Sequence, residues 1–199
     1  SPDFILLGNP ALLMRDEYRE LWGDIPIVLC SEENYLGPQE TYTKKQAIAT
    51  ADRTPLTQLA DPYNMVLLYS NLYLDENIQL ICHIVPEIKK FIFIGDARQI
   101  NQTNNLDIRN KLKKTHPNVE YQFITPQDMT TNQLLDSLYF VDPKTTGVLF
   151  SSWFYKTTFA GNTSLVSNAH KLIGTTAAHK IKQKKGEKKK KKKRKKKRE

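Results

Sequence analysis

Polar residues follow five short apolar runs of the chain, and these positions are the best candidates for chemistry. The runs occupy residues 4–7, 26–30, 91–94, 121–124 and 147–150. The segments after them begin with Gly8-Asn9, Ser31-Glu32, Gly95-Asp96, Thr125-Pro126 and Ser151-Ser152. Open parallel sheets bind ligands at the carboxyl ends of their strands. Small and hydrogen-bonding groups at such ends therefore predict a site for a small polar ligand.

Six of these residues are our candidates for direct ligand contact. They offer amides, carboxylates, one hydroxyl and one indole, whose flat face could stack on a ligand: Asn9, Glu32, Asp96, Gln99, Ser151 and Trp153. Helix N-termini nearby would add free N–H donors. Any one of these residues could equally be an ordinary turn or cap residue, so the prediction of a binding cleft depends on the whole set.

Catalysis and cofactor binding have no support in the sequence. Neither of the glycine-rich phosphate loops, GxGxxG or GxxxxGK[ST], occurs, and no serine lies in a GxSxG elbow. The first run ends in Gly8-Asn9, where a phosphoacceptor site of the receiver type needs an acidic pair. The four histidines show no HxxxH spacing, and we expect Cys30 and Cys82 to be buried thiols. We therefore expect a non-catalytic chain without a metal or a cofactor.

The elements that must position these residues are strands alternating with helices. The five runs have strand length and no polar alternation, which predicts strands buried on both faces. Helical patterns follow or precede them, beginning at Asn9, Asp75, Leu106, Thr130 and Asn162 or Thr163. Thr130 has a glutamine three residues later, the spacing of a capping box. This alternation predicts an α/β fold with parallel sheets covered by helices.

The segment 31–72 interrupts the alternation, because it is long, contains prolines and has a single apolar run at residues 65–69. Such a segment indicates function or a crossing between lobes. We place a boundary near residue 70. The expected parts are a partial first lobe with the crossing segment in 1–70, a second α/β lobe in 71–178 and a tail in 179–199.

The net positive charge of the chain comes entirely from that tail. Of the 30 basic and 21 acidic residues, 15 and 2 lie in 180–199, which leaves 15 and 19 for the rest. The folded part is therefore mildly acidic. From Lys184 onward every residue is Lys, Arg, Glu or Gly, so the tail is either disordered or the translation of a purine-only run. It could bind anionic polymers or lipids by counterion release, but it has no motif for specific nucleic-acid recognition.

Four stretches of the second half resemble a known family. They are FIFIGD at 91–96, FITPQDM at 123–129, TTGVLFSSWF at 145–154 and FAGNTS at 159–164. Together they resemble the periplasmic-binding-protein-like sensor domain of hybrid two-component histidine kinases and, more distantly, the substrate-binding proteins of ABC transporters. The resemblance covers roughly residues 2–178 and is weakest in 31–72.

The resemblance implies a periplasmic-binding-protein-like fold of type I, with two lobes, here incomplete at both ends. It implies a periplasmic location, a small polar ligand between the lobes (a sugar, an amino-acid derivative or an organic ion), and lobe closure that signals to kinase domains across the membrane. A homodimer is a further expected partner. Because the chain lacks the phosphoacceptor and ATP-binding regions of such kinases, we expect no kinase activity from it.

Two other functions stay open on the sequence. A substrate-binding protein of an ABC transporter would share the fold and the ligand site. A chain acting through its lysine-rich tail would bind anionic polymers without sequence preference, and this binding would weaken steeply with salt.

Overall fold

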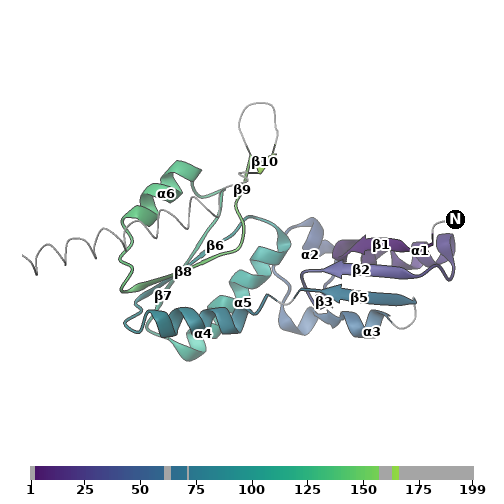
Figure 1. Ribbon diagram of the computed structural model, residues 1–199, viewed down its shortest axis with the longest axis horizontal. Coiled ribbons are helices and arrows are strands. Elements are labelled where there is room, and N and C mark those ends of the chain that lie inside the picture. The colour runs from purple at the N-terminus through teal and green to yellow at the C-terminus, as the bar shows by residue number, and fades with distance from the viewer. Residues whose placement is uncertain (1–2, 61–63, 71, 157–162, 166–199) are drawn as a thin grey trace, which may run out of the picture. The chain divides into compact units, whose positions relative to one another are not determined.

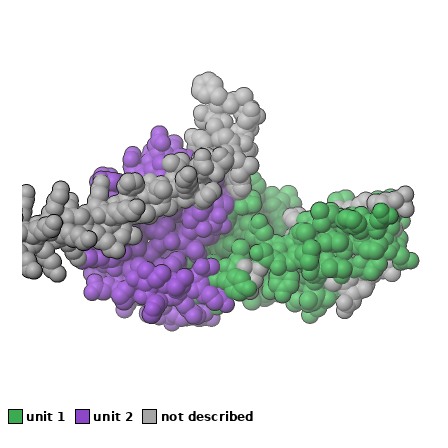
Figure 2. Space-filling model, viewed as in Figure 1, with its two compact units in different colours: residues 1–75, 98–108 green, residues 76–97, 109–199 purple. Residues whose placement is uncertain are grey.

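The computed structural model describes residues 3–60, 64–70, 72–156 and 163–165. The chain divides into two compact units, shown in green and purple in Figure 2. Unit 1 comprises Ser1–Asp75 and Arg98–Ile108, and unit 2 comprises Glu76–Ala97 and Arg109–Glu199. The first segment of unit 1 ends at Asp75, and a lobe boundary near residue 70 stays a prediction. The sequence did not indicate that residues 98–108 group with the first unit.

Unit 1 contains a three-stranded parallel sheet. Its strands are β1 (Ile5–Gly8), β2 (Ile27–Ser31) and β5 (Met65–Tyr69), in the order β1-β2-β5 (Figure 1). The central strand pairs on both sides, with Leu29 opposite Leu7 in β1 and Leu67 in β5. The strands predicted at 4–7 and 26–30 are confirmed, and the apolar run at 65–69 supplies the third.

The connections of unit 1 are short elements. After β1 come the 3-10 turn η1 (Asn9–Met14) and helix α1 (Arg15–Trp22), which ends at Gly23 with a φ of +56° that favours glycine. Between β2 and β5 the chain forms β3 (Tyr35–Leu36), α2 (Gln39–Thr43), η2 (Thr50–Asp52), β4 (Thr54–Pro55) and α3 (Leu56–Ala60), with β3 and β4 antiparallel. The segment 31–72 is therefore more regular than its sequence indicated.

The core of unit 1 lies on one face of its sheet. Four leucines from η1, β2, β3 and α3 are buried together there: Leu12, Leu29, Leu36 and Leu56. Inward-facing residues of the neighbouring strands, such as Leu7 and Leu67, pack against this cluster. Burying these side chains is the main force that orders the short elements around β2.

The other face of this sheet is exposed, which contradicts the expectation of strands buried on both sides. Leu6 is 64% exposed, Val66 56% and Leu68 55%. Cys30, which we expected to be buried, is exposed on β2 next to Leu68 of β5. The residues are apolar enough for a buried strand, but the inward and outward positions alternate as in a sheet with one covered face.

Unit 2 contains a second parallel sheet, in which β6 (Lys90–Ile94) lies between β7 (Glu120–Ile124) and β8 (Thr146–Phe150). Here the predicted burial is confirmed for the central strand, because the last four residues of β6 are buried. Helix α4 (Leu74–Ile84) precedes β6, α5 (Gln99–Thr115) connects β6 to β7, and α6 (Thr131–Tyr139) connects β7 to β8 (Figure 1). The α/β class with parallel sheets and flanking helices is therefore confirmed.

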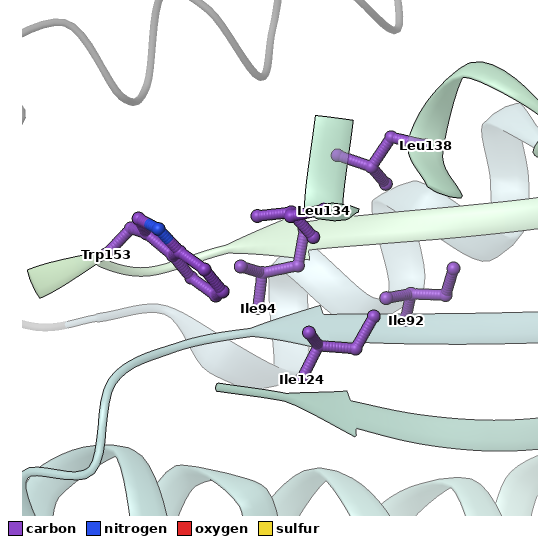
Figure 3. Packing of buried hydrophobic residues seen from close by; sticks show 6 residues of the cluster. All are labelled: Ile92, Ile94, Ile124, Leu134, Leu138 and Trp153. Atoms are coloured by element: carbon purple, nitrogen blue, oxygen red, sulfur yellow. The ribbon is translucent and has the colours of Figure 1, made fainter. Parts of the chain in front are cut away.

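One side of the β6 sheet packs against α6. Figure 3 shows the side chains of this layer: Ile92, Ile94, Ile124, Leu134, Leu138 and Trp153. Helix α6 begins with the predicted capping box, in which the Thr130 side chain accepts from the N–H of Gln133 and the Gln133 side chain accepts from the N–H of Thr130. On the opposite side of the sheet, a Cβ on Gly147 of β8 would collide with Ile81 of α4. Glycine is therefore required for this close approach of strand and helix.

The last described elements are β9 (Phe154–Lys156) and β10 (Thr163–Leu165), which pair antiparallel. The helix predicted to begin at Asn162 or Thr163 is wrong for 163–165, because those residues form β10. The remainder of that helix and the tail in 179–199 lie outside the described residues. Within the described part of the chain, no helix is long and apolar enough to cross a membrane.

Candidate functional site

A hollow of about 500 Å³ lies at the carboxyl end of β2, within unit 1. We call it the β2 hollow. It is lined by the end of β2, the turn after it, α2 with the residue following its C-cap, and the beginning of α5: Cys30, Ser31, Glu32, Glu33, Tyr42, Lys45, Arg98, Gln99 and Ile100. Two neighbouring hollows share Glu32 with it. The surface around this residue is therefore recessed on several sides.

The turn after β2 is fixed by Ser31. Its Oγ donates to the carbonyl oxygen of Glu33 and accepts from the Glu33 N–H at 3.0 Å. Serine hydroxyls form such local bonds where a strand gives way to a turn. The bonds place two consecutive carboxylate residues, Glu32 and Glu33, at the end of the strand.

A second wall comes from α2 and the residues after it. The hydroxyl of Tyr42 accepts from the N–H of Gly37 at 3.1 Å, which ties the helix to the segment before it. The N–H of Lys45 donates to the carbonyl of Tyr42, and the N–H of Gln46 donates to the carbonyl of Thr41. This pair of bonds is a Schellman motif, in which Lys45 occupies the left-handed position with a φ of 54°. A lysine at a position that favours glycine costs about 1–2 kcal/mol.

The third wall is the beginning of α5. Arg98 precedes the helix, and its carbonyl accepts from the N–H of Asn101 at 3.0 Å. The buried Gln99 donates from Nε2 to Thr103 Oγ1 at 2.7 Å, and the same oxygen accepts from the N–H of Ile48 at 3.0 Å. The Thr103 hydroxyl therefore joins the helix to the segment that follows α2, and Gln99 acts first as a positioning residue that holds this hydroxyl.

A network of charged and aromatic groups lies behind Glu33. The guanidinium of Arg53 donates to Asp107 Oδ1 at 2.7 Å and to the carbonyl of Ile48 at 3.0 Å, and it lies 4.7 Å from the centre of the Tyr35 ring. Burial raises the pKa of Tyr35 well above its ordinary value, and Glu33 raises it further through its charge and a hydrogen bond. Burial alone would lower the pKa of Arg53, but the hydrogen bond to Asp107 and the neighbouring charges raise it. These bonds hold the turn and the helix in place.

The hollow thus presents charges of both signs. Glu32 contributes an exposed carboxylate and Glu33 a partly buried one that bonds to Tyr35, and Lys45 and Arg98 contribute an ammonium and a guanidinium. Burial raises the pKa of Tyr42 to about 12, so its phenol stays protonated well above neutral pH. Such a lining can bind a small polar or charged molecule by hydrogen bonds and ion pairs.

Of the six residues predicted from the sequence, the structure brings Glu32 and Gln99 together in the β2 hollow. Asn9 is the first residue of η1, directly after β1, and its side chain lies outside what the structure describes. The other three, Asp96, Ser151 and Trp153, belong to unit 2.

The three residues of unit 2 make contacts inside that unit. The buried carboxylate of Asp96 accepts from Ser152 Oγ at 2.7 Å, and the N–H of Ser151 donates to the carbonyl of Ile94 at 2.9 Å. Trp153 is only 3% exposed and lies beside Ile94 and Leu134 (Figure 3). Its Nε1 donates to Thr131 Oγ1 at 3.0 Å. Stacking of this indole on a ligand stays a prediction, and it would require the ring to leave the hydrophobic layer.

Sequence reasoning missed seven of the nine lining residues of this site, five of them polar or charged and the other two Cys30 and Ile100. Ser31, Glu33 and Arg98 lie in the polar strand-end segments but were not selected, although their position after a strand was the signal that could have found them. Tyr42 and Lys45 come from the segment 31–72, where no pattern indicates that the chain returns to β2. Their place is set by the tertiary packing of Leu36 and Leu56.

Among the described residues, no cluster of three or more His, Cys, Asp or Glu side chains could hold a metal ion. The lining of the β2 hollow offers ion pairs and hydrogen bonds for a small molecule. Comparison of the chain with protein-family models, with curated proteins and with solved structures finds no match.

Proposed function

We propose that the chain is the ligand-binding part of an extracytoplasmic sensor of the histidine-kinase type, and that a small polar ligand binds in the β2 hollow. The observation that carries this proposal is the position of the hollow at the carboxyl end of a parallel strand, with charged side chains around it. Parallel α/β sheets bind small molecules at such ends. A volume of about 500 Å³ suits a ligand of the size of a sugar or an amino acid.

The fold supports the same proposal. Each unit holds a parallel sheet with helical connections, as the two lobes of a periplasmic-binding-protein-like fold of type I would. We therefore propose that units 1 and 2 correspond to these lobes. We prefer this fold over other α/β folds because of the resemblance of the four sequence stretches. Three of them include the ends of strands β6, β7 and β8 and the residues that follow.

Binding without catalysis fits the chemistry of the lining residues. The hydroxyl at the end of β2 is that of Ser31, and it bonds to the backbone of Glu33. A nucleophilic hydroxyl would instead bond to a general base. Signalling then requires that the ligand bind one conformation better than another. A differential affinity of a few kcal/mol changes the populations by one or more orders of magnitude.

A thermal-shift screen followed by calorimetry tests this proposal. The full chain is heated with neutral sugars, amino acids and small organic anions and cations, and the compound that raises the melting temperature most is titrated. We expect saturable binding that the double variant Glu32→Gln, Arg98→Gln weakens at least tenfold. The control variant Glu20→Gln changes an exposed charge on α1 and should bind as the unmodified chain does. Saturable binding that both variants retain would place the ligand elsewhere.

A further inference from the structure

Resting on the proposed function, we propose that the β2 hollow selects a zwitterion, specifically a molecule that carries a protonated amine and a carboxylate a few bonds apart, such as a free amino acid. The observation is that carboxylates and cations line one recess of about 500 Å³ and come from different elements. A neutral sugar could also accept and donate hydrogen bonds here, but it has no charge to pair with four charged side chains, whereas a ligand with complementary charges pairs with both signs.

The turn after β2 supplies the negative side. Glu32 and Glu33 follow each other, and the bonds of Ser31 to the Glu33 backbone fix the conformation of this turn. Tyr35 and Tyr42 also lie in the field of the Glu33 carboxylate, since its charge contributes to the raised pKa of both phenols. A protonated amine of the ligand would be attracted to this pair of carboxylates and could donate up to three hydrogen bonds.

The beginning of α5 supplies the positive side. Arg98 lies directly before the helix, and Gln99 and Ile100, its first two residues, line the hollow. The first turn of a 17-residue helix has N–H groups that lack partners within the helix and a positive end of the helix dipole. Together with the planar guanidinium of Arg98, these groups suit a carboxylate of the ligand.

Lys45 adds a second cation at a strained position. Its left-handed φ of 54° would be relaxed by glycine, yet the chain has a lysine that lines the hollow. The two signs of charge are thus carried by different segments, the carboxylates by the turn after β2 and the cations by Lys45 after α2 and Arg98 before α5. A ligand with a single charge would pair with either the carboxylates or the cations. The other charged groups would then stay hydrated or repel the ligand.

The experiment compares a free amino acid with two derivatives that each lack one charge. The twenty common amino acids are screened singly by thermal shift on the full chain. The best one is then titrated by calorimetry beside its N-acetyl derivative, which lacks the amine charge, and its carboxamide, which lacks the carboxylate. Glucose and galactose serve as neutral compounds of similar size. We expect each derivative to bind about tenfold to a hundredfold more weakly than the free amino acid, which is the effect of losing one charged hydrogen-bonded pair.

Charge-neutralising variants identify which residue of the hollow binds the amine of the ligand and which binds its carboxylate. Glu32→Gln should reduce the preference for the free amine over the N-acetyl derivative, and Arg98→Gln should reduce the preference for the carboxylate over the carboxamide. Lys113→Gln, an exposed change on the last turn of α5, is the matched control and should alter neither preference.

The outcomes separate this inference from the proposed function. Saturable binding of a sugar that Glu32→Gln weakens, with no response to any amino acid, would overturn the zwitterion inference and leave the binding function standing. Equal affinity for the free amino acid and either derivative would also overturn the inference. No saturable binding of any compound in either screen would count against both.

Discussion

The sheet of unit 1 should respond very differently to the same mutation on its two faces. Leu29 of β2 is fully buried in the leucine cluster, whereas Leu68 of the neighbouring strand is 55% exposed on the opposite face. Truncation of a buried leucine to alanine removes its transfer free energy and leaves a cavity, which together cost about 2–5 kcal/mol. Leu68 already has more than half of its surface in water, so Leu68→Ala should cost less than about 1 kcal/mol.

The assay must report unit 1 by itself. The chain has two tryptophans, Trp22 in α1 and Trp153 in unit 2, so a Trp153→Phe background leaves Trp22 as the sole tryptophan fluorophore. Urea unfolding of Leu29→Ala and Leu68→Ala in this background is followed by Trp22 fluorescence and compared at two protein concentrations. The slope with urea should stay the same, which shows that the free energies can be compared.

Equal, large losses from both substitutions would refute the assignment of Leu68 to an exposed face. If the loss from Leu68→Ala appeared only at the higher protein concentration, the face would be covered by a second copy of the chain. Small losses from both would show that Leu29 does not lie in a packed core.

Three further predictions concern single features of the two units. Thr130→Ala removes the cap of α6 and should destabilise unit 2 by about 1 kcal/mol, while Thr130→Ser should restore most of the loss, as measured by urea unfolding. Arg53→Gln leaves the half-buried Asp107 without its 2.7 Å ion pair and should cost unit 1 about 1.5–3 kcal/mol, and the second change Asp107→Asn should recover part of it in a double-mutant cycle. Burial raises the pKa of Tyr121 above its unfolded value near 10, so the unfolded state loses its proton first and stability should fall as pH rises above 10. Tyr121→Phe should make this decrease in the free energy of unfolding with pH shallower. An unchanged decrease would contradict the burial of the Tyr121 hydroxyl.

Much of the fold could be predicted because its determinants are local. Strand β6 and the end of β8 are continuous apolar runs, and the capping box at Thr130 is indicated by a threonine and a glutamine three residues apart. Which faces of the unit 1 sheet are buried could not be predicted in the same way. Leu6 and Leu68 have the composition of buried strand residues, and whether a face is covered depends on elements far away in the chain.

The candidate site was predictable only in part for the same reason. Glu32 and Gln99 follow strands or begin helices, so their position at a strand end is visible in the sequence. Lys45 lines the hollow because of the Schellman motif after α2. This motif could not be predicted, because its left-handed position has a lysine where glycine is usual. Trp153 follows β8, which the sequence shows, but its burial in the hydrophobic layer of α6 and β6 is not visible there, and its contact with a ligand stays a prediction.

The most direct test of the account is an NMR titration of the isotope-labelled full chain with the compound that stabilises it most in the thermal-shift screen. If the ligand binds in the β2 hollow, the largest saturable shifts will fall on the backbone amides of residues 31–33, 42–45 and 98–100. Shifts that instead centre on Asp96, Ser151 and Trp153, with the amides of the β2 hollow unchanged, would contradict the central claim that the hollow of unit 1 is the ligand site.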